Sequence, residues 1–141
     1  MGKRAEILRL SEAAHDAVLL PRDPGGLSYG LRAALAARMA RHNRSPALAS
    51  HYDTLVARAG EAATALLAEP GTKVTDPRTA EIVRHADRLT LAPRDATRAD
   101  VEALGQVGVT DADIVRLAEL AAFVNYQVRV LAGLKLLGEM R

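Results

Sequence analysis

The sequence contains no cysteine and no tryptophan, and its only aromatic residues are one phenylalanine and three tyrosines among 141 residues. The absence of cysteine excludes disulfide bonds, thiolate catalysis and cysteine-based metal sites. It is compatible with a reducing compartment, so we expect a cytoplasmic protein. The scarcity of aromatic side chains also leaves few surfaces on which nucleic-acid bases could stack.

A large excess of charge of one sign is missing as well. Lys and Arg number 19 against 17 Asp and Glu, and the two signs are interspersed. Nucleic-acid-binding domains usually carry a clustered basic stripe, so we expect no nucleic-acid partner. No stretch approaches the roughly 18 uninterrupted apolar residues of a membrane helix, and no apolar segment of a signal peptide follows the N-terminus, so we expect no membrane association.

Alanine, leucine and valine dominate the hydrophobic residues, which make up 49% of the chain. They recur at spacings of three and four, which predicts amphipathic helices. Capping residues, first-turn prolines and terminal glycines divide the pattern. The predicted helices cover residues 3–20, 29–42, 46–60, 61–69, 77–90, 98–107 and 111–137. The length fits one domain, so we predict a single all-α, multi-helix domain over residues 1–141.

The last predicted helix is apolar on more than one face. Such a helix is either central in its domain or lies at a subunit interface, so we expect a homo-oligomer. Asn125 and Arg129 lie four residues apart within this apolar surface. Because buried polar groups need partners, we interpret them as a structural network or an interface ion pair rather than as ligand contacts.

The turn between the second and third predicted helices is the expected place for a site. Ser45 and Pro46 are typical of an N-cap followed by a first-turn proline, and a helix N-terminus carries unpaired N–H groups and partial positive charge. His51 lies in the second turn of the same helix, at the border of its apolar face, where a neutral imidazole can exchange protons near neutral pH. Tyr52 points more towards the core.

Other motifs of catalysis are missing. The sequence has no HExxH, no GxGxxG, no phosphate loop and no nucleophile elbow. We therefore expect no metal and no cofactor. His15 lies among the apolar residues of the first predicted helix, and we interpret it as a boundary or core histidine.

The most specific motifs lie towards the C-terminus. They are Leu89-Thr90, Thr97-x-Ala99-Asp100-Val101-Glu102-Ala103-Leu104, Gly108-Val109-Thr110-Asp111-x-Asp113-Ile114, Ala121-Ala122-Phe123-Val124-Asn125, Arg129 and Ala132-Gly133. With residues 31–52, they resemble the carboxymuconolactone decarboxylase and alkylhydroperoxidase D-like superfamily, in particular its peroxidase-related branch. The resemblance implies an all-helical domain that assembles as dimers, trimers or hexamers. In redox members, a Cys-x-x-Cys pair at a helix start reduces peroxide or a disulfide partner, and a Glu and a His relay protons.

The residues of that redox centre do not carry over. Aligning residues 41–43 with the superfamily's Arg-x-Asn places Ser45 and Leu48 at the two cysteines. It places Tyr52 at the relay His and Ala33 at the relay Glu. Serine neither ionises readily nor forms a disulfide, so this register contains no thiol chemistry.

A register shifted by one residue stays open. It aligns Leu48-x-x-His51 with the Leu-x-x-His of the decarboxylase branch and places His51 at the family His. Arg44 and Ala47 then occupy the cysteine positions, and Arg32 occupies the Glu position. This register does not supply a cysteine either.

Two functions are compatible with the sequence. The first is a protein without thiol peroxidase activity that acts as a homo-oligomeric paralogue or partner of a cysteine-bearing, peroxidase-related protein. The second is a cysteine-free lyase or decarboxylase-like enzyme acting on a small carboxylic acid or lactone. Its candidate catalytic residues are His51 and Tyr52, and its candidate substrate-binding residues are Arg38, Arg44 and Ser45. A polar cavity in which His51 meets an arginine would favour the enzyme, and solid Ala/Leu packing there would favour the first function.

Overall fold

The structure, a computed structural model, describes residues 2–139, with the side chains of residue 2, residue 6 and residues 11–139. Within that range every regular element is helical and no strand occurs, which confirms the all-α prediction. The elements are α1 (Lys3–Leu19), α2 (Tyr29–His42), α3 (Pro46–Ala59), α4 (Ala62–Ala65), the 3₁₀ turn η1 (Leu66–Ala68), α5 (Pro77–Leu91), the 3₁₀ turn η2 (Pro93–Asp95), α6 (Arg98–Gln106) and α7 (Asp111–Glu139).

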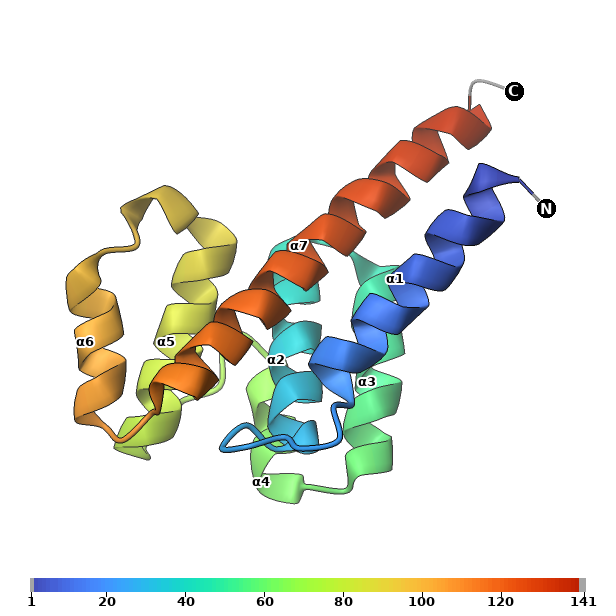
Figure 1. Ribbon diagram of the computed structural model, residues 1–141. Helices are drawn as coiled ribbons and strands as arrows, with labels where there is room; N and C mark the ends of the chain where they lie inside the picture. Colours follow the sequence, from blue (N-terminus) through green and yellow to red (C-terminus); the bar gives the residue numbers. More distant parts are fainter. Residues whose placement is uncertain (1, 140–141) are drawn as a thin grey trace.

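Helix α2 lies at the centre, between α3 on one side and α5 on the other, with α7 crossing it (Figure 1). Residues 31–40 are all buried, and five of these ten residues are alanine, whose small side chain lets neighbouring helices approach closely. The sequence predicted a single apolar stripe here. Because α2 is instead covered on all sides, its charged residues Arg32 and Arg38 are buried too.

The loop between α1 and α2 is fixed by two buried charged groups. The Arg32 guanidinium donates to three backbone carbonyls, those of Val18, Pro24 and Leu27, at 2.8–2.9 Å. The Asp113 carboxylate, from α7, accepts from the backbone N–H of Gly26 at 3.1 Å and lies so close to it that a Cβ there would clash. These bonds set the position of α1 relative to the centre of the domain.

Residues 61–69 differ most from the prediction of one continuous helix. Gly60 ends α3 in the left-handed conformation, with φ of 67°, and the chain continues as the short elements α4 and η1. The Arg38 guanidinium bonds the carbonyl oxygens of Leu67 and Glu69 at 3.3 and 3.1 Å. A continuing helix would need these oxygens for its own ladder, so the buried arginine stops it.

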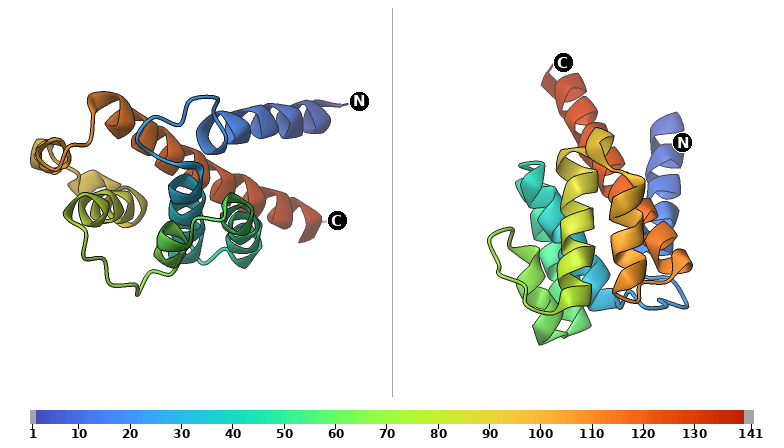
Figure 2. Two further views of the ribbon diagram at one scale, coloured as in Figure 1. Left: turned by 90° about the horizontal axis from the view of Figure 1, so that it is seen from below. Right: turned by 90° about the vertical axis from the view of Figure 1, so that its left-hand side faces the viewer.

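Helices α5 and α6 pack side by side on the flank of α2 away from α3 (Figure 2). A capping box is present at the start of α6, with Thr97 and Asp100 satisfying each other's backbone N–H groups. Asp100 also accepts from Arg84 of α5 at 3.1 Å. This pair of helices is therefore tied together at its polar edge as well as by its apolar contacts.

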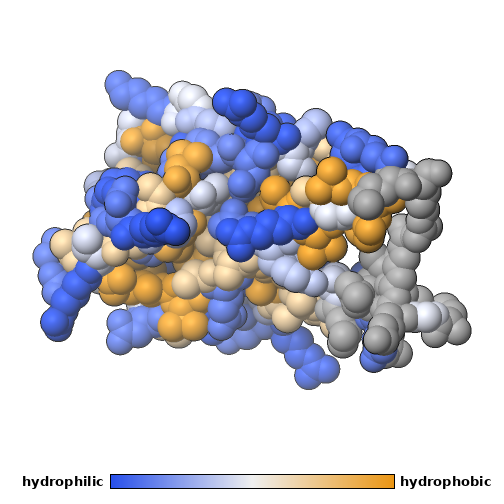
Figure 3. All heavy atoms as spheres, turned by 90° about the horizontal axis from the view of Figure 1, so that it is seen from above, coloured by the Kyte–Doolittle hydropathy of each residue, from blue (hydrophilic) through white to orange (hydrophobic). Residues whose placement is uncertain are grey.

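The two halves of α7 differ. Its N-terminal half buries Leu117, Leu120 and Phe123 in the core. None of residues 126–139 is buried, although Tyr126 and Leu131 are among them, and this half runs outward beside α1 (Figure 1). In space-filling view, apolar patches alternate with charged side chains (Figure 3).

Among the described residues, α7 alone is long and apolar enough to cross a membrane by length and composition, and 22% of that stretch is buried. One such helix is weak evidence of a membrane span, because the core helix of a soluble protein, which is mostly buried, meets the same criterion. The helix also contains charged residues such as Arg129. These charges explain why the sequence shows no uninterrupted apolar run.

Candidate functional site

The turn between α2 and α3 is closed by backbone hydrogen bonds. Ser45 N–H donates to the carbonyl of Ala40 at 2.9 Å, and Arg44 adopts the left-handed conformation with φ of 55°. Pro46 opens α3 as predicted, but the Ser45 side chain makes no capping bond, so its expected role as a side-chain cap is wrong. Its backbone, with ψ of 89°, differs from that of Ser28, with ψ of 162°, whose hydroxyl does cap α2.

His51 of α3 meets a histidine that the sequence did not assign to the site. Its Nε2 lies 2.9 Å from Nε2 of His15 on α1. The other ring nitrogen of His15, Nδ1, lies 2.9 Å from a carboxylate oxygen of Asp16. The side chain of His15 is 14% exposed, whereas that of Asp16 is 68% exposed. Asp16, His15 and His51 thus form a chain of hydrogen bonds beside a cleft, and both ends of the chain, Asp16 and His51, are exposed.

That cleft has a volume of about 660 Å³ and lies between α1, α3 and α7. Its described lining residues are Ser11, Glu12, His15, Asp16, Leu48, His51 and Gln127. The His15–His51 pair is part of this lining, and no arginine or lysine is among these lining residues. The cleft thus places polar side chains beside His51, but most of its accessible lining is apolar and it lacks the arginine, so it meets the criterion set out for an enzyme only in part.

The pKa of His51 is lowered from its ordinary value. Burial is the largest cause, because the charged imidazolium loses water contacts, and repulsion from His15 and from Arg58 adds to it. His51 is therefore neutral near pH 7 and has a lone pair with which to accept a proton.

Tyr52 is fully buried, and its hydroxyl donates a hydrogen bond to Oε1 of Gln127. Burial raises the pKa of this phenol. Its ring lies nearly parallel to that of His15, with the ring centroids 6.1 Å apart. Tyr52 thus packs behind the histidine pair and fixes Gln127, rather than lining the cleft itself.

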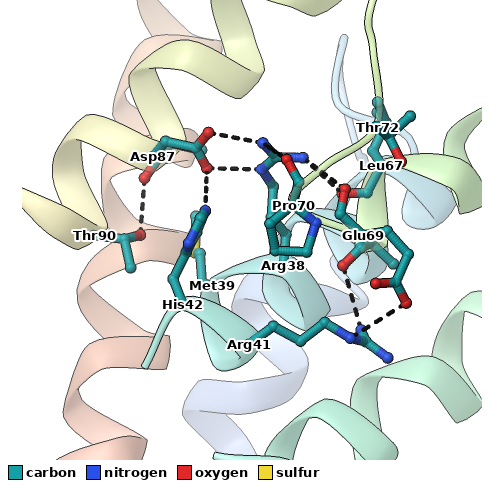
Figure 4. Close-up of polar contacts among 12 residues, drawn as sticks. Arg38, Met39, Arg41, His42, Leu67, Glu69, Pro70, Thr72, Asp87 and Thr90 are labelled. Carbon is teal, nitrogen blue, oxygen red and sulfur yellow. Dashed lines mark hydrogen bonds and ion pairs between the residues drawn. The ribbon is translucent and has the colours of Figure 1, made fainter. Parts of the chain in front are cut away.

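Arg38 belongs to a different cluster (Figure 4). Its Nε and Nη2 donate to the two carboxylate oxygens of Asp87 on α5, at 2.7 and 2.8 Å. Its remaining contacts are the carbonyls of residues 67, 69 and 70. His42 completes the cluster, with Nε2 2.9 Å from Asp87. Arg38 is therefore not brought to the cleft, and its donors are occupied by protein acceptors.

The other predicted binding residues also lie outside the cleft lining. Arg44 is exposed at the turn, and Ser45 is partly buried there. Of the two positions aligned with the superfamily's cysteines, only Leu48 lines the cleft. Ala33, aligned with the relay Glu, lines a separate apolar cavity of about 230 Å³ beside Leu55 and Ala59.

Four residues of the cleft were missed by the sequence reasoning: Ser11, Glu12, Asp16 and Gln127. No local motif marks them, because α1 and α7 are brought to α3 only by tertiary packing. The available signal was the spacing of Ser11, Glu12, His15 and Asp16, which places them on one face of a helix. Among the described residues, no group of three or more His, Asp or Glu side chains is arranged to hold a metal ion.

Asn125 is part of a structural network, as the sequence indicated. Its side-chain oxygen accepts from Nδ2 of Asn43 at 3.1 Å, and the same Nδ2 reaches the carbonyl of Met39 at 3.0 Å. The end of α2 is thereby attached to α7. Arg129 is exposed.

No protein-family model and no curated protein matches the sequence. Two solved structures match it at a TM-score of 0.79. One is an uncharacterized peroxidase-related protein from Silicibacter sp. TM1040, 22% identical, with 92% of this chain and 68% of that chain covered. The other is an alkylhydroperoxidase AhpD core, an uncharacterized peroxidase-related protein from Ralstonia eutropha JMP134, 24% identical, with 92% and 69% covered. The chain therefore has the AhpD-like all-α fold that the resemblance predicted, in a sequence without cysteine.

Proposed function

We propose that this chain is a thiol-independent enzyme in which His51 transfers protons to and from a small substrate held in the cleft between α1, α3 and α7. The observation that carries the proposal is the Asp16–His15–His51 chain of hydrogen bonds beside a cleft lined by both polar and apolar groups. Convergent titratable groups in a concave pocket are the usual composition of a proton-transfer site. The lowered pKa of His51 supports the role of base, because the neutral imidazole is the form that accepts a proton.

The charge of the cleft bears on the substrate. Glu12 and Asp16 line it, and its described lining residues include no cation. A carboxylate substrate would meet repulsion there, whereas a neutral lactone would not. Of the two substrate classes that the sequence left open, a small lactone fits this lining better. Ser11 and Gln127 offer polar atoms to its carbonyl and ring oxygens.

The test is a screen of small lactones and carboxylic acids with the full chain, His51→Ala and His51→Gln. Loss of a general base typically lowers a rate by about 10²–10⁴-fold, so both variants should fall that far on any substrate found. His42→Gln is the matched control, because His42 bonds Asp87 outside the cleft. Wild-type rates and pH dependence in both His51 variants would remove His51 from the role.

Thiol-dependent peroxidase activity should be absent, because that chemistry begins with a thiolate and the chain contains no cysteine. Peroxide turnover by metal-free and haem-free protein, coupled to a disulfide reductant, would contradict this expectation.

A second candidate function is a non-catalytic one, as an oligomeric partner of a cysteine-bearing, peroxidase-related protein or as a homo-oligomer of two, three or six copies. The observation that favours it is the outer half of α7, which exposes Tyr126, Leu131, Leu136 and Leu137. Apolar side chains in this number along the unburied half of a helix are typical of an interface.

A further inference from the structure

We infer that His15 is the positioning residue of the cleft: it holds the Nε2–H of His51 in a hydrogen bond and leaves Nδ1 of His51 as the atom that accepts the substrate proton. Neither the sequence motifs nor the resemblance assigns a role to His15. The inference rests on the proposed function only for the use of His51 as a base. The hydrogen-bond arrangement itself is a property of the unliganded protein.

The first step is the protonation of His15. An ionised carboxylate only accepts hydrogen bonds, so Nδ1 of His15 must carry the hydrogen in its 2.9 Å contact with Asp16. A neutral imidazole has one N–H. Nε2 of His15 is therefore a lone pair, which is the reverse of the Nε2–H form that a free histidine side chain favours in water.

The second step passes from His15 to His51. Their Nε2 atoms are 2.9 Å apart, a distance at which one nitrogen must donate and the other accept. Because Nε2 of His15 is the acceptor, Nε2 of His51 is the donor. The remaining nitrogen of His51, Nδ1, then carries the lone pair of the neutral ring.

The groups around the pair are consistent with a neutral ring in the resting protein. Asp16 and Glu12 approach from α1, Arg58 acts on His51 from within α3, and Gln127 borders the cleft from α7. The ring centroids of His15 and His51 lie 5.0 Å apart, so two imidazolium ions there would repel each other. One added proton, by contrast, can be accommodated by the pair.

The proton balance of the step is simple. Nδ1 of His51 takes one proton from the substrate, and the ring becomes an imidazolium. Its Nε2–H still points at the lone pair of His15, and this bond strengthens because its donor now carries charge. The same proton returns from Nδ1 to the product. His15 keeps its Nδ1–H bonded to Asp16 throughout, so it orients His51 without exchanging a proton with the substrate.

The experiment is ¹⁵N NMR of the histidine side chains in the labelled full chain at about pH 8, where an unperturbed histidine is neutral. The variants are Asp16→Ala and the matched control Glu12→Ala, which removes a carboxylate of the same cleft that makes no hydrogen bond to a histidine among the described residues. In the wild type and in Glu12→Ala, His15 should give a pyrrole-like Nδ1 signal and a pyridine-like Nε2 signal. In Asp16→Ala, His15 should shift towards the Nε2–H form.

Three results would overturn the inference: His15 in the Nε2–H form in the wild type, His51 in the Nδ1–H form, or an equal change in both variants. Each is read without any substrate. Failure of the lactone screen with the expected tautomers intact would count against the proposed function and leave the positioning role standing. The opposite result, activity lost in His51→Ala with a free Nε2–H on His15, would keep the function and reject the positioning role.

Discussion

Histidine meets aspartate in two places in this domain, and the two places differ in how fully their polar atoms are used. At the α2–α5 contact, Asp87 bonds both His42 and the buried guanidinium of Arg38, whose other donors are held by backbone carbonyls. At the cleft, Asp16 bonds only His15, which in turn bonds His51 beside an open volume. Similar residue types thus form a structural contact whose polar atoms are hydrogen-bonded within the protein in one place, and a site with polar atoms available to a ligand in the other.

The two clusters should differ most clearly in how much stability is lost when the aspartate of each is removed. In Asp87→Ala, the Arg38 side chain, which is 6% exposed, keeps a buried charge without a counter-ion, so the free energy of unfolding should fall by about 3 kcal/mol. Asp16→Ala removes an exposed carboxylate and should change it by less than about 0.5 kcal/mol. Urea unfolding of both variants checks this difference, and equal losses would mean that the cleft chain is also a structural contact.

The outer half of α7 borders the cleft side of the domain. Its exposed apolar side chains are a second way in which this side differs from the closed α2–α5 contact. We expect the unmutated chain to be a homo-oligomer, because burying exposed apolar surface stabilises association by about 25 cal/mol per Å² before binding costs. Leu131→Asp should give monomer or aggregate, and Val128→Asp, at a partly buried residue that packs against the core, should do so while also lowering the free energy of unfolding. Light scattering measures the mass, and Val101→Asp on α6 is an exposed apolar control away from this half of α7. A stable monomer for the unmutated chain would reject the expected assembly.

The fold followed from the sequence because its signals are local. Helical spacing, the proline at the start of α3 and the capping box at Thr97 and Asp100 each depend on neighbouring residues, and the structure contains them. The cleft did not follow, because His15 and His51 are 36 residues apart and meet only through the packing of α1 against the core. Arg38 was assigned to a substrate for the same reason: its acceptor, Asp87, lies 49 residues away.

The fourth histidine, His85, tests how burial acts away from both clusters. His85 is 4% exposed, and its Nδ1 is buried without a hydrogen-bond partner. Burial lowers its pKa, although Asp100 and Glu81 oppose the shift and Arg84 adds to it. Above the ordinary pKa of about 6.5 both states are neutral, so stability is complete there.

As the pH falls below that value, the unfolded state binds the proton first and stability is lost, by up to about 1.4 kcal/mol per pH unit, until the pH reaches the folded pKa. Urea unfolding at about pH 7.5 and about pH 5.5 should show this loss in the wild type and a smaller loss in His85→Leu. His51→Gln measures how much of the stability loss comes from the cleft, because the pKa of His51 is lowered as well. An unchanged pH dependence in His85→Leu would show that His85 does not cause the loss.

The smallest expected effect lies at the turn between the two clusters. Arg44 holds φ at 55°, a conformation that costs a residue with a Cβ about 1–2 kcal/mol. Arg44→Gly relieves this strain but adds about 0.5–1 kcal/mol of entropy to the unfolded chain, so a net gain of about 0.5–1 kcal/mol in the free energy of unfolding should remain. Arg44→Ala keeps the Cβ and removes the guanidinium, so its stability should stay near that of the wild type. The same pair tests the predicted substrate contact, because a binding role for the guanidinium would raise KM equally in both variants. A raised stability in Arg44→Gly with an unchanged KM in both variants would assign Arg44 to the geometry of the turn alone.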